Sequence, residues 1–561
     1  MTNPTPSPAG WLDDLLVAHQ QLWGSPTTPA IAPGTTALPW TQWTHDVARW
    51  QQQAMRQMTV PGSHGQPEVV APAAPDRRFA GAAWQADPRF LLLSRSYVAQ
   101  SDQLQQSLQS APVDERSKAQ WSFALRQVVD ALSPANFMAT NPEVLQTAMD
   151  SGGASLLQGM QLFLQDLAQG RITQTDHSAF EVGRNLATSP GSVVFENELM
   201  QLIQYAPATT RVHRRALVVI PPFINKFYIL DLQAENSLVA FAVSQGHTVF
   251  LVSWRNAGPE QGRLQWDDYL ELGVLQAIEA ALAISGGDRV NTVGFCVGGT
   301  LLASGLAVLA ARHQDRVASL TLLTTMLDFS DTGEIGLLVD EAAVQGHEAR
   351  IGQGGLLKGS SLAQVFAALR ANDLIWPYVV NGYLKGQAPA AFDLLFWNAD
   401  DTNLPGPMFC WYLRNTYLEN KLRVPGGTLQ CKTPVDLGQV MVPAFLYASR
   451  EDHIVPWKTA YASSQLLGGD CCFVLGASGH IAGVINPPAK NKRNHWIGTV
   501  QPDAQAWLEQ ARSVPGSWWS QWSDWLEPHG GPFIAAPKAP GTRKFPVIEA
   551  APGRYVKAKA Q

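Results

Sequence analysis

A cysteine lies between two closely spaced glycines in the segment VGFCVGGTLLASGLAVLAARH, residues 293–313. The residues before Cys296 form an apolar run typical of a buried strand, and those after Gly298 have the composition of a buried helix. This strand–turn–helix layout, G-x-C-x-G, presents a nucleophile at a crowded turn that requires small neighbours. The helix N-terminus also favours a thiolate there. We predict that Cys296 is a nucleophile; a structural cysteine beside packing glycines is the alternative.

Such a nucleophile needs an acid and a histidine, which in α/β-hydrolases follow it in the chain on loops after late strands. Asp452 follows the apolar run VPAFLYAS, and His480 follows CCFVLGAS. The acid would hold one imidazole nitrogen so that the other can take the thiol proton. Chain order and strand position favour Cys296, Asp452 and His480 as the catalytic residues.

Other residues could fill the same two roles. His453 and His495 compete for the position of the histidine, and Asp400 or Asp401 could supply the acid instead. The sequence leaves these alternatives open.

An acyl-transfer site also needs two backbone N–H donors for the oxyanion. Val297, directly after the nucleophile, supplies the first. The second should come from the segment VVIPPFINKFY after an early strand, where Pro221 and Pro222 have no N–H. Phe223 or Ile224 is therefore the nearest candidate, unless the two prolines only end the strand.

Composition excludes several classes of function. The net charge is −6 and only 15% of residues are charged, so a basic nucleic-acid-binding surface is not expected. Five thinly spread cysteines suit a reducing cytoplasm better than a disulfide framework. No apolar stretch reaches the roughly 18 residues of a membrane span, and no metal-binding motif is present. We expect a cytoplasmic protein with no membrane span, no metal and no cofactor.

The elements that position these residues follow a mixed pattern. Short apolar runs alternate with helical windows from about residue 215, namely RALVVI, HTVFLVSW, RVNTVGF, VASLTLLTTM, VPAFLYAS and CCFVLGAS. Such alternation predicts a parallel sheet covered on both faces, hence an α/β fold with an α/β-hydrolase-type catalytic domain over residues 181–561. Between about 331 and 433 the alternation lapses, which predicts a cap or lid insertion.

The rest of the chain divides into two further parts. Residues 1–75 are rich in Pro, Ala, Thr and Gln and are predicted to be a flexible, partly disordered tail. Residues 76–180 show helical spacing, with Asn141 and Pro142 as a helix start, and predict a helical domain. Near the C-terminus, WWSQWSDW places Trp518, Trp522 and Trp525 on one helical face, which indicates core or interface packing or contact with an apolar product.

Several sequence blocks in order resemble the poly(3-hydroxyalkanoate) synthases, most closely the class I single-subunit type. The resemblance runs from about Arg77 to the C-terminus, and the first 70 or so residues carry no match. The blocks include DRRFAGAAW, PPFINKFYILDL, VGFCVGGT, TLLTTMLDFSDTG, FDLLFWNADDTNLPGP, SREDHIVPW, LGASGHIAGVINPPAKNKR and APGRYVKAKA. One such block could arise by chance, but this many in order is specific.

The resemblance implies an acyltransferase that polymerises (R)-3-hydroxyacyl-CoA, chiefly 3-hydroxybutyryl-CoA, into polyhydroxyalkanoate with release of CoA. It implies that Cys296 carries the acyl group, that His480 activates it, and that Asp452 is the acid and also helps to activate the incoming hydroxyl. Trp397 and Asp328 match positions in the same blocks and would have supporting roles; core packing is the alternative for both. His453, next to Asp452, would also have a supporting role. The family also implies a homodimer bound to polyhydroxyalkanoate granules in the cytoplasm.

Two other functions compete with this interpretation. A cysteine-dependent thioesterase or an intracellular polyester depolymerase would use the same triad with water as the acceptor, because the fold does not determine the acceptor. A non-catalytic granule-surface protein could keep the fold, although an intact nucleophile turn with acid and histidine in order argues against it.

Overall fold

The computed structural model describes residues 76–560, which form two compact units. The helical unit comprises residues 76–176 and 366–391, and the sheet unit comprises residues 177–365 and 392–560. The middle of the 331–433 insertion thus belongs to the helical unit, whereas the sequence pattern assigned all of it to the catalytic domain. The predicted tail 1–75 lies outside the described residues.

The helical unit is built on capped helices. Its long helices are α4 (Pro88–Gln109), α5 (Glu115–Ala131), α6 (Pro142–Asp150) and α7 (Ala154–Gln169). The side chain of Asn141 accepts hydrogen bonds from the N–H groups of Glu143 and Val144, so α6 begins where the sequence predicted. A small core of Phe79, Trp84, Tyr97, Leu125, Val129 and Ala135 holds the unit together.

The sheet unit contains an 11-stranded sheet in the order β15-β14-β13-β12-β7-β6-β4-β5-β2-β1-β17. Its strands are β1 (Gly191–Glu196), β2 (Met200–Tyr205), β4 (Leu217–Ile220), β5 (Val249–Trp254), β6 (Val290–Phe295), β7 (Val317–Leu323), β12 (Ala444–Ser449), β13 (Cys471–Gly476), β14 (Asn494–Gly498), β15 (Arg512–Pro515) and β17 (Glu549–Ala550). The six strands from β13 to β5 are parallel, and the outer ones are antiparallel. These six are the apolar runs that the sequence predicted as strands.

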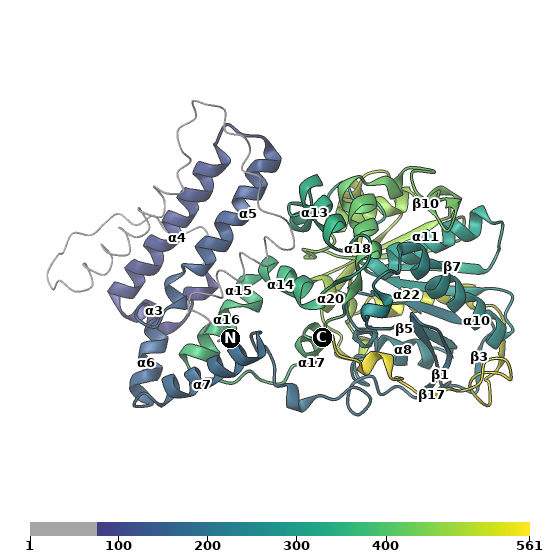
Figure 1. Cartoon of the computed structure of the whole chain (residues 1–561), viewed down its shortest axis with the longest axis horizontal. Coiled ribbons are helices and arrows are strands. Elements are labelled where there is room, and N and C mark those ends of the chain that lie inside the picture. The colour runs from purple at the N-terminus through teal and green to yellow at the C-terminus, as the bar shows by residue number, and fades with distance from the viewer. Residues whose placement is uncertain (1–75, 561) are drawn as a thin grey trace. The chain divides into compact units, whose positions relative to one another are not determined.

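Helices pack against the sheet, as Figure 1 shows for α8 (Leu238–Ser244), α10 (Gln276–Ser285), α11 (Val297–Ala311) and α22 (Trp519–Leu526). Trp518, Trp519 and Trp522 are at most 2% exposed and belong to the main core. The tryptophan-rich segment is therefore core packing, and these three side chains are not available to an apolar product. None of the helices within residues 76–560 combines the length and apolar character needed to cross a membrane.

The parallel register brings several strand ends to one edge of the sheet. Ile220 of β4 pairs with Gly294 of β6, Phe295 of β6 with Leu323 of β7, and Ser449 of β12 with Gly476 of β13. The loops that follow these strands carry the predicted site residues. Ligands of open α/β sheets bind at this carboxyl edge, so the topology assembles the predicted residues in one place.

Candidate active site

Cys296 occupies a strained turn between β6 and α11. Its backbone has φ +53° and ψ −129°, a combination that side-chain-bearing residues rarely adopt. β6 ends one residue before it, and α11 begins one residue after it. The half-buried thiol thus lies at the N-terminus of a 15-residue helix, where the helix dipole stabilises negative charge.

Close backbone approaches explain the glycines around Cys296. A Cβ atom on Gly294 would lie 2.4 Å from the Cα of Gly299, and one on Gly298 would lie 2.5 Å from the carbonyl oxygen of Ile220. A Cβ on Gly299 would lie 2.1 Å from the Oγ1 of Thr325. Side chains at Gly294 and Gly298 would push α11 away from β6 and β4, and one at Gly299 would clash with the side chain of Thr325, so the close packing of this turn favours glycine at all three.

The acid and the histidine come from the loops after β12 and β13. His480, the first residue of α20 (His480–Val484), donates from Nδ1 to Oδ2 of Asp452 over 2.6 Å. The other oxygen, Oδ1, accepts from the N–H groups of Ile454 and Val455 at 2.8 and 2.9 Å. The side chains of His480 and Asp452 are 5% and 0% exposed. The carboxylate is therefore held by its own loop while it orients the imidazole.

Cys296 acts on the same imidazole, so the structure brings together the three residues that the sequence predicted for the site. Burial by itself lowers the pKa of His480, but the charges of Asp452 and Cys296 and hydrogen bonds to both raise it to about 10. The ring stacks on Phe295 with centroids 5.7 Å apart. An imidazolium at His480 stabilises negative charge on the sulfur.

This electrostatic arrangement predicts how His480 titrates. The pKa of His480 is raised from 6.5 to about 10, so the imidazolium persists below about pH 10 and is lost above it. In an NMR titration we expect the imidazole of His480 to stay protonated between about pH 7 and about pH 9, where an ordinary histidine is neutral. In Cys296→Ala, which removes one of the groups that raise this pKa, the proton should be lost at lower pH. A native His480 that lost its proton within that range would contradict the expectation.

The candidate oxyanion donors lie next to the nucleophile. Val297 is the first residue of α11, and residues 221–226, here called the oxyanion loop, follow β4 beside Gly298. Within the described part of the chain, the N–H groups of Val297, Phe223 and Ile224 donate to no backbone carbonyl. The side chain of Phe223 is 1% exposed and packs edge-on against Tyr269 and Tyr412.

The competing residues have other partners. His495 lies on β14, and its Nδ1 donates to the carbonyl oxygen of Gly516 over 3.2 Å. Asp400 accepts a hydrogen bond from the hydroxyl of Tyr228 over 2.9 Å, and Asp401 forms an isolated antiparallel bridge with Asn225. His453 follows Asp452 directly in the chain and is half-buried. The carboxylate of Asp452 is bonded to His480.

The two supporting candidates, Trp397 and Asp328, each bind a neighbouring loop. Trp397 is 4% exposed and donates from Nε1 to the carbonyl oxygen of Lys226 over 2.7 Å. Asp328 accepts from Ser330 Oγ at 2.6 Å and from Asn420 Nδ2 at 2.8 Å, and it forms an ion pair with Arg423. These contacts position the loops rather than the reacting atoms.

Aromatic residues of the insertion form part of the site that the sequence did not reveal. Tyr412, the last residue of α18 (Gly406–Tyr412), and Tyr417 pack edge-on with ring centroids 5.7 Å apart, and Phe329 packs against both. Burial is the main cause that raises the pKa of both tyrosines, and the proximity of Cys296 contributes. Both hydroxyls therefore stay protonated beside the sulfur. The only sequence signal was their place in the insertion.

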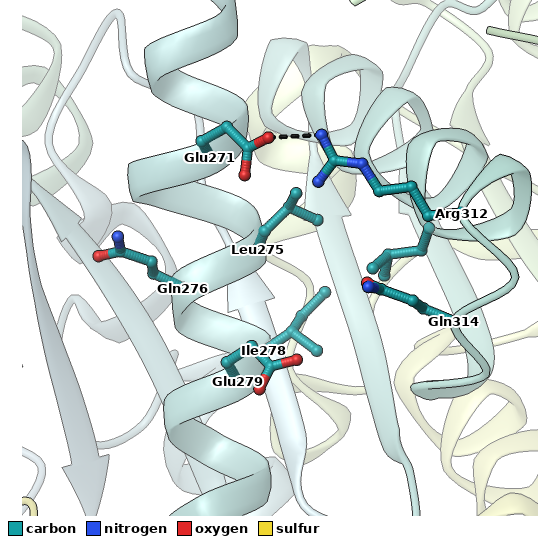
Figure 2. Close-up of a pocket in the computed structure, with 8 residues that line it drawn as sticks. Glu271, Leu275, Gln276, Ile278, Glu279, Arg312 and Gln314 are labelled. Carbon is teal, nitrogen blue, oxygen red and sulfur yellow. Dashed lines mark hydrogen bonds and ion pairs between the residues drawn. The ribbon is translucent and has the colours of Figure 1, made fainter. Parts of the chain in front are cut away.

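A surface pocket between α10 and α11 is remote from this site. Figure 2 shows its lining, in which Arg312 donates to Glu271 over 2.6 Å. The pocket reaches the C-terminal end of α11, whereas Cys296 precedes its N-terminus, and a 15-residue helix spans about 22 Å. The pocket is thus separate from the nucleophile. Among residues 76–560, no group of three or more side chains is arranged to hold a metal ion.

Two family models match most of the chain. Residues 75–242 match the family model described as poly-beta-hydroxybutyrate polymerase (PhaC) N-terminus, and residues 216–487 match the alpha/beta hydrolase fold. The second match agrees with the sheet topology, so the predicted fold class, an α/β-hydrolase fold preceded by a helical region, is confirmed.

Relatives of known name cover most of the chain. A poly(3-hydroxyalkanoate) polymerase subunit PhaC of Cupriavidus necator is 53% identical over 89% of this chain and 85% of its own length. The corresponding subunit of Rhizobium meliloti is 42% identical over 86% of this chain and 80% of its own length. A poly(3-hydroxyalkanoate) polymerase of Methylorubrum extorquens is 43% identical over 88% of this chain and 82% of its own length.

Proposed function

The chain belongs to the poly(3-hydroxyalkanoate) polymerase family, and from this premise we propose how its residues join hydroxyacyl units into a polyester. The substrate of the proposal is (R)-3-hydroxyacyl-CoA, with 3-hydroxybutyryl-CoA as the main one. Cys296 is the nucleophile, His480 the acid–base group and Asp452 its orienting carboxylate. The observation that carries this assignment is the hydrogen bond from Nδ1 of His480 to Asp452, together with the effect of Cys296 on the pKa of the same imidazole.

The first half-reaction loads the enzyme. The sulfur of Cys296 attacks the thioester carbonyl, and the resulting oxyanion is bound by the N–H groups of Val297 and of Phe223 or Ile224. The bond to the CoA sulfur then breaks, and His480 supplies the proton that CoA carries away. One thioester has replaced another, so this step is nearly balanced in free energy and the acyl group can wait on the enzyme.

The second half-reaction forms the ester. The 3-hydroxyl of another acyl unit loses its proton to His480 and attacks the carbonyl of the acyl-cysteine. The carbon–sulfur bond breaks, which returns Cys296 to its starting form and lengthens the chain by one unit. Asp452 stabilises the imidazolium that forms each time.

The acceptor distinguishes this reaction from hydrolysis. The test mixes the purified chain with 3-hydroxybutyryl-CoA, follows CoA release with a thiol reagent and weighs the insoluble polyester. Matching amounts of CoA and polymer support the proposal. CoA release with free 3-hydroxyacid and no polymer would instead favour a thioesterase.

The proposal also covers location and assembly: a homodimer in the cytoplasm, attached to the granules of its product. An apolar stripe on α7 supports the attachment. Its four side chains are each more than half exposed, at Leu157, Met160, Leu164 and Leu167. Their spacing places them along one side of the helix. An exposed apolar row of this kind suits contact with a polyester surface.

A charge placed on this stripe should weaken granule binding. We expect Leu157→Asp combined with Leu164→Asp to lower the fraction that sediments with poly(3-hydroxybutyrate) granules by about tenfold or more, because each buried apolar side chain contributes about 1.5 kcal/mol or more. The initial rate of CoA release should not change, since α7 belongs to the helical unit. Gln158→Asp with Gln165→Asp, on exposed positions outside the stripe, is the matched control. Equal sedimentation of both variants would remove α7 from the proposed contact.

A further inference from the structure

The C-terminal tail, residues 551–560, is attached along its length to the sheet unit. β17, just before it, pairs with β1 at the edge of the sheet. The hydroxyl of Tyr555 donates to the carbonyl oxygen of Asn197 over 2.9 Å, and Val556 is 1% exposed. These contacts hold the tail so that its last residues reach the oxyanion loop.

Lys226, the last residue of the oxyanion loop, makes the direct link to the tail. Its side chain lies in the interior, with the residue 3% exposed, and Nζ donates to the carbonyl oxygen of Ala558 over 2.7 Å. The carbonyl oxygen of Lys226 accepts from Nε1 of Trp397, also over 2.7 Å. A buried ammonium is costly without an acceptor, so the loop and the tail depend on each other.

A second set of contacts connects the same three segments. Asp400 is 3% exposed, accepts from the hydroxyl of Tyr228 over 2.9 Å, and lies 2.9 Å from Nζ of Lys559 in the tail. The neighbouring Asp401 pairs with Asn225 of the oxyanion loop in an antiparallel bridge. The loop is therefore bound by the insertion on one side and by the tail on the other.

We infer that Lys226 is a positioning residue of the oxyanion hole, and that the C-terminal tail fixes the loop that carries Phe223 and Ile224. The inference rests on the proposed function, because it concerns the loop that would supply the second oxyanion donor. Lys226 binds Ala558 and not the reacting atoms. An oxyanion donor must lie within about 3 Å of the developing charge, and a displacement of about 1 Å costs rate at the chemical step.

The charge on Lys226 gives the link a pH dependence. Burial lowers the pKa of Lys226 to about 8; Asp400 and Asp401 oppose this lowering, and Lys559 adds to it. These three are the charged groups that act on Lys226 from the insertion and the tail. Below about pH 8 the ammonium makes a charge-assisted bond to Ala558, and above it the bond weakens. We expect kcat of the native enzyme to fall as the pH rises through about 8.

The test uses full-length enzyme with 3-hydroxybutyryl-CoA as substrate and three changes: Lys226→Met, a chain ended after Lys557, and both together. Each single change should lower kcat by about 10-fold to 100-fold, with KM altered by less than about twofold. The double change should be no slower than either single change, because both break the same link. Lys226→Met should also lose the kcat step near pH 8. Lys557→Met, an exposed lysine of the same tail, should behave as wild type.

Thermal stability separates positioning from a merely structural role. The shortened chain leaves the Lys226 ammonium buried without its carbonyl and should melt at a lower temperature. Adding Lys226→Met removes that charge and should restore the melting temperature while kcat stays low. Three results would each overturn the inference. The double change could recover kcat together with the melting temperature, or its loss of kcat could equal the product of the two single losses. The native enzyme could also show no step in kcat near pH 8.

The same assay separates this inference from the proposed function. If CoA release depends on Cys296 but the Lys226→Met enzyme is as fast as wild type, only the proposed role of Lys226 is wrong. A native enzyme that releases no CoA from 3-hydroxybutyryl-CoA would defeat the proposed function itself.

Discussion

Cys296→Ala is expected to lower the rate of CoA release by about 10⁴-fold or more and to abolish polymer formation, because under the proposed function the acyl-enzyme forms on the sulfur of Cys296. The variant should fold as the native chain does. Alanine is smaller than cysteine and keeps a Cβ, so the strained turn between β6 and α11 gains no new clash. Stopped assays with a thiol reagent, together with the weighed polymer, measure both losses at once.

The matched control removes a different thiol. Cys472 lies on β13 and packs partly against the main core, so Cys472→Ala tests the loss of a sulfur away from the nucleophile turn. We expect this variant to keep the native rate of CoA release. If Cys296→Ala retained more than about one per cent of the native rate, far above the loss expected for a removed nucleophile, Cys296 could not be the acyl-carrying residue.

Asp452→Asn is expected to lower kcat by about 10³-fold to 10⁴-fold at about pH 7.5. The folded structure of the variant should remain close to that of the native enzyme. Asparagine can still accept the backbone N–H groups of Ile454 and Val455, but its uncharged amide cannot stabilise the imidazolium at His480. The change also removes a main cause of the raised pKa of His480, so that pKa should fall below about 10 while burial continues to lower it.

The pH dependence provides a specific signature for Asp452→Asn. In an NMR titration, the imidazole of His480 should lose its proton at lower pH in the variant than in the native enzyme. Asp503→Asn serves as the control: Asp503 caps α21 (Ala504–Gln510) by accepting from Ala506, and it is exposed. An Asp452→Asn enzyme with native kcat and a native titration of His480 would require a different acid.

Under the proposed function, the choice of acceptor depends on the surroundings of Cys296 rather than on the triad. The rings of Phe329, Tyr412 and Tyr417 pack together, and Cys296 is among the groups that raise the pKa of both tyrosines. We expect these rings to exclude water from the acyl-enzyme, which would favour attack by the hydroxyl of a second acyl unit. The same triad in an open, wet site would hydrolyse its acyl-enzyme.

Much of the fold was predictable because it depends on local sequence. Continuous apolar runs separated by helical windows identified all six parallel strands, and an Asn–Pro pair identified the start of α6. The spacing of Gly294, Cys296 and Gly298 identified the tight turn between β6 and α11, since steric crowding at that turn excludes larger residues. Each of these signals spans fewer than about 20 residues, the range over which periodicity and sterics act.

The remainder depended on contacts between distant segments. The sequence offered Asp400, Asp401 and Asp452 as acids, and only the packed sheet brings one of them within 2.6 Å of His480. Residues 366–391 join the helical unit through partners more than 200 positions away, such as Asp166, which accepts from the hydroxyl of Tyr383. No periodic pattern reports which of these surfaces will meet.

By itself, the sequence determined the secondary structure, the fold class and the identity and order of the candidate catalytic residues. The tertiary structure decided which acid faces the histidine, which aromatic side chains lie beside the sulfur, and that Lys226 meets Ala558, 332 positions later in the chain. The physical reason is that a turn or a strand is selected by the sterics and hydrophobicity of its own residues. A buried charge or hydrogen bond is selected by whatever partner the completed fold brings to it.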